Sequence, residues 1–109
     1  MVVGVGQVLL RLPGNHSLKG KRRILRQIVE RIKQRFNISI AEVDAQDQWQ
    51  LIYLGISQVG LNGDRIRTEL DKVLNFIEKM NLVEIIDVEL EIIHFSTKDI
   101  LHEKLSPCL

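Results

Sequence analysis

The spacing of the apolar residues in this 109-residue chain switches twice from strand-like to helix-like, and that order limits what the chain can fold into. Runs of β-branched and other apolar residues predict four strands, at residues 2–12, 38–45, 49–59 and 83–95. Apolar residues at helical spacing predict a first amphipathic helix of about nineteen residues from Leu18, and a second one from Ile66 to Met80. The order of the elements is therefore βαββαβ.

The residues between these segments agree with that order. Pro13-Gly14-Asn15 predicts a turn after the first strand, and Ser17 can cap the first helix. Asn37 can end the same helix in the left-handed conformation. A βαββαβ order predicts an α+β, ferredoxin-like fold, in which right-handed crossovers place both helices on one face of a four-stranded antiparallel sheet.

The first and third predicted strands are apolar on both faces, which predicts that they are the central strands of the sheet. In the first strand, for example, Val5 and Leu9 alternate with Val8 and Leu10. One face packs on the helices, and the other has nothing in the domain to cover it except the C-terminal segment. An uncovered apolar face indicates a partner, and a homodimer through the open sheet face is the simplest one.

Length and composition indicate one domain at residues 1–95, followed by a tail at residues 96–109 that forms a short helix or frays. The apolar stretch at residues 2–10 is interrupted by two glycines and a glutamine and is too short to span a bilayer. We therefore expect neither a signal peptide nor a contact with a membrane. The single cysteine, Cys108, fits the reducing cytoplasm, where we expect the protein to be.

Charge is distributed very unevenly along the chain. Residues 11–35 hold nine of the fifteen basic side chains and one acid, whereas residues 36–109 hold six bases and thirteen acids. The net charge of +1 therefore conceals a strongly basic first helix. The predicted phosphate-binding residues on this helix are Lys19, Lys21, Arg22, Arg23, Arg26 and Lys33.

Three interpretations of the basic helix remain open. It can be a solvated surface, a docking surface for an acidic protein, or a surface that follows phosphates, where each cation adds affinity by releasing counterions. The arrangement is unfavourable for the helix itself, because the pairs Lys19–Arg23 and Arg22–Arg26 place like charges one turn apart. The first of these cations also lie at the positive end of the helix dipole.

The predicted sheet offers little for reading bases. Trp49 and Tyr53 share one face of the third strand and could stack on bases. The last strand places three acids on that same face: Asp87, Glu89 and Glu91. Since these acids repel a phosphate backbone, any contact with RNA should run along the first helix and residues 13–21, and should depend on shape and charge more than on sequence.

No set of side chains predicts catalysis, so we expect no enzyme activity, no metal and no cofactor. The segment from Gly14 to Lys21 has one residue too many for a nucleotide-binding phosphate loop, and Arg22 stands where Ser or Thr would bind magnesium. Gly4 and Gly6 lack the third glycine of a dinucleotide-binding fingerprint and are interpreted as room for a helix or a partner chain. The acids near the predicted hairpin turn are interpreted as turn residues and not as a metal cluster: Glu42, Asp44 and Asp47.

Two segments of the sequence resemble a known family. Residues 17–22 read Ser-Leu-Lys-Gly-Lys-Arg, and residues 35–44 read Arg-Phe-Asn-Ile-Ser-Ile-Ala-Glu-Val-Asp. With Gln46-Asp47 and Trp49-Gln50, they resemble the signature of the YlxP-like family, small bacterial proteins of unknown function. The resemblance extends from the first strand to about Ile93. It implies a ferredoxin-like fold, no established catalytic activity, and a role near the ribosome, because members are often encoded beside translation factors and ribosome-binding factor A.

One position departs from the family pattern. The family usually has Glu where this chain has Gly20, and a glutamate there would complete a capping box with Ser17. We therefore expect the start of the first helix to be looser and more basic than in other members.

The expected function is a non-enzymatic module that associates with RNA or the ribosome through phosphates bound by the first helix. The alternative is a protein-interaction module that forms a homodimer through the open sheet face and docks its basic helix on an acidic partner. A sensor for a small molecule or an anion is a third possibility, since ferredoxin-like folds serve many functions.

Overall fold

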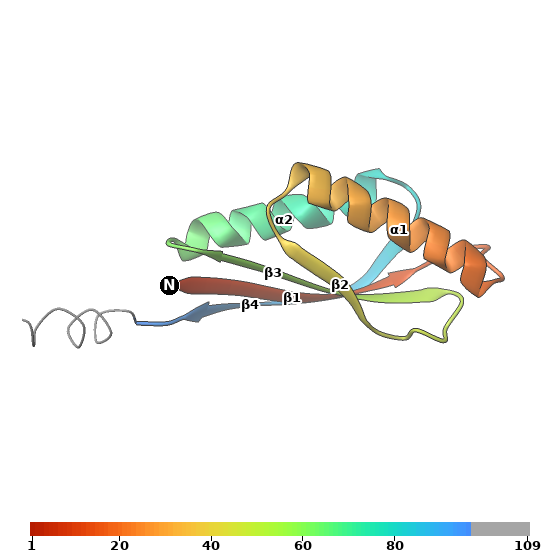
Figure 1. Ribbon diagram of the computed structural model, residues 1–109, viewed down its shortest axis with the longest axis horizontal. Coiled ribbons are helices and arrows are strands. Elements are labelled where there is room, and N and C mark those ends of the chain that lie inside the picture. Colours follow the sequence, from red (N-terminus) through yellow and green to blue (C-terminus); the bar gives the residue numbers. More distant parts are fainter. Residues whose placement is uncertain (97–109) are drawn as a thin grey trace, which may run out of the picture.

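The computed structural model describes residues 1–96. Its elements are β1 (Val2–Arg11), α1 (Leu18–Arg35), β2 (Ser39–Asp44), β3 (Leu51–Gly60), α2 (Gly63–Lys79) and β4 (Glu84–His94). This is the predicted βαββαβ order, and both helices lie on the same face of the sheet (Figure 1). The predictions for the C-terminal tail concern residues that, from 97 onward, lie outside the described part of the chain.

The sheet is antiparallel, with the strand order β2-β3-β1-β4. β1 and β3 are therefore the central strands, as their apolar character on both faces predicts. Val8 and Leu10 of β1 are fully buried under the helices, whereas Val5 and Leu9 lie on the opposite, open face and are only partly covered. The fold is thus a two-layer, ferredoxin-like α+β domain with its core between the helices and one face of the sheet.

A glycine in β1 lets α2 approach the sheet closely. A Cβ atom added to Gly4 would overlap Cγ2 of Ile66 and lie 2.9 Å from Cδ1 of Leu70, and both of these α2 residues are buried. The room left by Gly4 is therefore filled by a helix of the same chain. The sequence predicted room at this glycine for either a helix or a partner chain, and a helix occupies it.

The first helix begins as predicted and ends differently. Ser17 is its N-cap, and the Ser17 hydroxyl accepts a hydrogen bond of 3.0 Å from the backbone N–H of Gly20. The helix ends at Phe36, which has extended backbone angles. The prediction that Asn37 ends it in the left-handed conformation is wrong, because Asn37 does not have a positive φ; its carbonyl accepts a hydrogen bond of 3.2 Å from the Gln58 side chain.

The β2–β3 hairpin departs from regular pairing in two places. The register shifts between Glu42 and Asp44, so that Val43 is an extra residue in β2, and its side chain lies against Gly55 of β3. Ala45, directly after β2, has a φ of 60°, in the left-handed region. Trp49 precedes the start of β3 at Leu51, so the predicted strand began two residues too early.

Candidate nucleic-acid interface

Five of the six predicted phosphate-binding side chains are exposed on α1: Lys19, Arg22, Arg23, Arg26 and Lys33. The first turn of α1 contains no acid that could offset them. Within residues 1–96 the ion pairs are Arg11–Glu84 and Lys21–Glu42, so none of the five exposed cations is paired with a carboxylate there. Their charges are directed at solvent (Figure 1 shows α1 on the outside of the domain).

Lys21 is the exception, and its assignment to the phosphate-binding surface is wrong. The residue is 2% exposed, and its ammonium lies 3.0 Å from Oε2 of Glu42 and donates a 2.5 Å hydrogen bond to the carbonyl of Ala45. The sequence contained the signal for this burial. Lys21 precedes Ile28 by seven residues and Ile32 by eleven, so all three share the face of α1 that packs on the sheet.

The β2–β3 hairpin supplies both partners of Lys21. Glu42 lies in β2 at a register position that turns its side chain toward α1, and that side chain is 18% exposed. Ala45 presents its carbonyl from the left-handed turn after β2, where its N–H is bound by the Asp44 carboxylate at 2.7 Å. These contacts support the interpretation of the acids near the turn as structural residues.

Gly20 gives the start of α1 a different anchor from the expected capping box. The Asn15 side chain lies where a Cβ atom on residue 20 would be, and it donates hydrogen bonds to the carbonyls of Ser17 at 2.9 Å and Trp49 at 2.6 Å. The loop before α1 is thereby joined to the segment before β3. These bonds do not replace the one that a capping-box glutamate would accept from the Ser17 N–H, so Asn15 anchors the helix start by a different route, and the looser start stays a prediction.

The structure adds two cations of α1 that the sequence analysis did not assign to a site. Arg31 and Arg35 line a groove between α1 and α2, together with Lys72 and Lys79 of α2 and a single acid, Glu69. Lys33, by contrast, lines a hollow on the other side of α1, beside β2. Cations therefore lie on both flanks of the exposed face of α1.

Aromatic residues stabilise that groove. The Phe36 and Phe76 rings meet edge to face with their centroids 5.7 Å apart, and the Arg35 guanidinium lies 5.0 Å from the centre of the Phe76 ring. Both rings are partly buried. They hold Arg35 and the C-terminal halves of the two helices in place, and their contacts with each other leave them poorly suited to stacking on bases.

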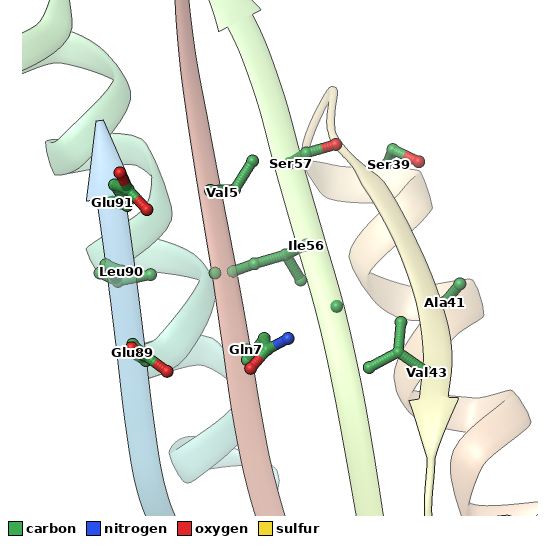
Figure 2. A pocket seen from close by; sticks show the side chains of 12 residues that line it. Val5, Gln7, Ser39, Ala41, Val43, Ile56, Ser57, Glu89, Leu90 and Glu91 are labelled. Atoms are coloured by element: carbon green, nitrogen blue, oxygen red, sulfur yellow. The ribbon is translucent and has the colours of Figure 1, made fainter. Parts of the chain in front are cut away.

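The open face of the sheet has a different character (Figure 2). Ala41, Val43 and Ser57 are small, uncharged residues on one side of it, whereas the carboxylates of Glu89 and Glu91 lie along β4 on the other. The Tyr53 hydroxyl donates a 3.2 Å hydrogen bond to Gln7 on this face. Since Trp49 lies outside β3 and the acids lie where predicted, the open face supplies no pair of stacking aromatics for a nucleic acid.

Residues 1–96 also bear on metal binding and on membrane spanning. No group of three or more metal-ligating side chains gathers in this part of the chain. None of its helices has the length and hydropathy that a membrane span requires. The candidate site of the described residues is therefore the charged surface of α1 and the groove beside it.

These features define a class of protein: a small ferredoxin-like α+β domain whose first helix exposes cations that have no carboxylate partner within residues 1–96. The chain belongs to the family described as "Protein of unknown function (DUF503)", which matches residues 3–90. It is 40% identical over 68 residues to the uncharacterized protein YlxP of Bacillus subtilis (strain 168), a match that covers 62% of this chain and 74% of that protein. The resemblance to the YlxP-like family is thus confirmed.

A solved structure with a similar fold is the de novo designed protein Foldit4. The two share a TM-score of 0.51 and 16% sequence identity, over 88% of this chain and 100% of the designed chain. At this identity the similarity concerns the fold alone, and it agrees with the βαββαβ topology.

Proposed function

We propose that the protein is a non-enzymatic, cytoplasmic RNA-binding module that associates with RNA or the ribosome through phosphates held by α1. The observation that carries the proposal is the row of exposed cations without a carboxylate partner within residues 1–96: Lys19, Arg22, Arg23, Arg26 and Lys33. A phosphodiester backbone supplies the negative charge that this surface lacks.

Folding gives no reason for this arrangement. Arg22 and Arg26 lie one turn apart on an exposed surface, as do Lys19 and Arg23, and each such pair destabilises a helix by about 0.2–0.5 kcal/mol. The only buried cation of the helix, Lys21, is fully accounted for by Glu42 and Ala45. Lys21, whose charge is paired inside the fold, is therefore a different residue from the exposed cations that repel one another. The exposed cations have no role in the fold of residues 1–96, and this supports the proposal of an external ligand.

A filter-binding measurement with a structured RNA tests the proposal. Affinity should fall steeply between about 50 and 200 mM salt, because each phosphate contact releases counterions. The double variant Arg22→Glu/Arg26→Glu should abolish binding without lowering the melting temperature, since both side chains are exposed. Absent binding, or binding that does not respond to salt, overturns the proposal.

The matched control places the same charge change on α2. Arg65 and Arg67 are exposed near the start of α2, which lies at the opposite end of the domain from the start of α1 (Figure 1). The variant Arg65→Glu/Arg67→Glu should keep most of the affinity. An equal loss in both double variants would indicate a response to net charge alone and would contradict a site on α1.

A second candidate function is a protein-interaction module, and the uncovered face of the sheet favours it. Val43 is 51% exposed there, beside the partly covered Val5 and Leu9. A homodimer through this face is measured by light scattering of the purified protein across a concentration series. Val43→Lys should shift a dimer to monomer, and a wild-type protein that stays monomeric at high concentration contradicts this candidate.

A further inference from the structure

The outermost line of α1 differs in chemistry from its flanks. Five exposed residues spaced by four, four, three and four positions form this line: Lys19, Arg23, Gln27, Glu30 and Gln34. We call them the crest of α1. Its last three residues carry amide or carboxylate groups, so that this part of the crest offers hydrogen-bond acceptors and uncharged donors where the flanks offer cations.

Cations border the crest on both sides. On the side of β2, Lys33 continues the row begun by Arg22 and Arg26. On the side of α2, Arg31 and Arg35 line the groove, and α2 adds Lys72 and Lys79. An α-helix with its side chains is about 10–12 Å across, so the two rows of cations are separated by roughly the width of one helix.

This pattern fits a double helix better than a single strand. The A-form RNA duplex has a wide, shallow minor groove that displays 2′-hydroxyl groups between its two phosphate backbones. A helix laid across it places its flanks near the two backbones and its outermost residues near the hydroxyls. Each 2′-hydroxyl both donates and accepts hydrogen bonds, which matches the amides of Gln27 and Gln34 and the carboxylate of Glu30.

The surface lacks the features that a single strand requires. Single-stranded RNA is held mainly by aromatic side chains that stack on its unpaired bases. The exposed positions of α1 carry no aromatic residue, and Phe36 and Phe76 contact each other and Arg35. The exposed Trp49 precedes β3 and lies off the crest.

We propose that α1 binds double-stranded RNA across its minor groove, with the crest of α1 on the 2′-hydroxyls and the two rows of cations on the two phosphate backbones. This inference rests on the proposed function and specifies its substrate class. The groove between α1 and α2 is then a second line of phosphate contacts and part of the interface.

Three ligands of the same sequence test the substrate class: an RNA duplex of about 16 base pairs, one of its single strands, and the corresponding DNA duplex. The RNA duplex should bind at least about tenfold more tightly than either competitor at the same salt concentration. Equal or tighter binding of the single strand overturns the inference but leaves the proposed function standing. Equal binding of the DNA duplex overturns the role of the 2′-hydroxyls. Failure to bind any of the three overturns the proposed function itself.

Variants of the crest separate hydroxyl contacts from phosphate contacts. Gln27→Ala/Gln34→Ala keeps the net charge and favours helix formation, so the domain should remain folded. Affinity for the RNA duplex should fall about three- to tenfold, as expected for the loss of two hydrogen bonds, while affinity for the DNA duplex stays unchanged. Equal losses of affinity for the two duplexes, or no loss of affinity for the RNA duplex, contradict the proposed contact between the crest and the 2′-hydroxyls.

Variants of the groove test the second backbone contact. Arg31→Glu/Lys72→Glu removes one groove cation from each helix and leaves Arg35 on Phe76. The affinity for the duplex should fall much more than in the control Arg65→Glu/Arg67→Glu, and the slope of affinity against salt should become shallower. A groove variant that binds like the control shows that the duplex does not enter the groove, which overturns this part of the inference.

Discussion

The ammonium of Lys21 lies 3.0 Å from the carboxylate of Glu42, and this buried pair joins α1 to the β2–β3 hairpin. Both residues belong to the two segments that resemble the YlxP-like signature. Part of this signature therefore lies inside the fold, while the cations beside Lys21 are exposed to solvent.

Removal of one member of this pair should destabilise the domain strongly. Lys21→Met leaves Glu42 without its counter-charge and the Ala45 carbonyl without its donor, which should lower the free energy of unfolding by about 3–5 kcal/mol. Urea unfolding of Lys21→Met, Glu42→Leu and the double variant measures the coupling. The double variant should be more stable than the sum of the two single losses implies, and strictly additive losses would contradict a direct pair.

Gly20→Ala should fail to stabilise α1. Alanine usually stabilises a helix by about 1 kcal/mol relative to glycine. Here the added methyl group displaces the Asn15 side chain and weakens its hydrogen bonds to the Ser17 and Trp49 carbonyls. In an Asn15→Ala background the same substitution should regain its usual benefit. The idea fails if Gly20→Ala stabilises the wild-type protein to the same extent, as measured by thermal melting.

Gly4→Ala should overpack the contact between β1 and α2. The new methyl group meets Ile66 and Leu70, which are buried, and the expected loss is about 1–3 kcal/mol. Ile66→Ala removes the atom in the closest contact, so the loss from Gly4→Ala should shrink in that background. A loss that is independent of residue 66 would show that α2 does not lie against Gly4.

Glu30→Gln should strengthen RNA binding. Glu30 is the single acid on the exposed face of α1, and on the proposed RNA-binding surface its carboxylate would repel phosphates bound near Arg26 and Lys33. Removing one charge near the surface should raise affinity about two- to fivefold at low salt, since unit charges about 4 Å apart in water interact by about 1 kcal/mol. Glu78→Gln on α2 is the control with the same charge change and should leave affinity unchanged. Equal gains in the two variants would place the ligand elsewhere.

The sequence predicts the fold well because its strongest signals are local and periodic. The two-sided apolar character of the first and third strands identified them as central, and Ser17 marked the start of α1 correctly. Asn37 and Trp49 were misjudged because both lie at boundaries, where hydrogen bonds to distant segments decide the conformation.

The candidate site was predicted less completely. Counting charge along α1 cannot distinguish an exposed cation from a buried one. The spacing of Lys21 from Ile28 and Ile32 indicated its burial, but its partner Glu42 lies twenty-one residues away and is brought near by the packing of β2 against α1. The groove cations were missed for the same reason. Arg31 and Lys72 line the same groove because α1 and α2 pack side by side. The charge pattern of one helix does not show this packing.

The burial of Lys21 has a mechanical consequence for its neighbour Arg22. The ammonium of Lys21 is held inside the domain by Glu42 and Ala45, so the first turn of α1 is tethered to the β2–β3 hairpin. Arg22 and Arg23 therefore extend from an anchored turn of helix, and less backbone freedom is lost when a ligand binds there. A preorganised surface of this kind favours partners whose own shape is equally stiff.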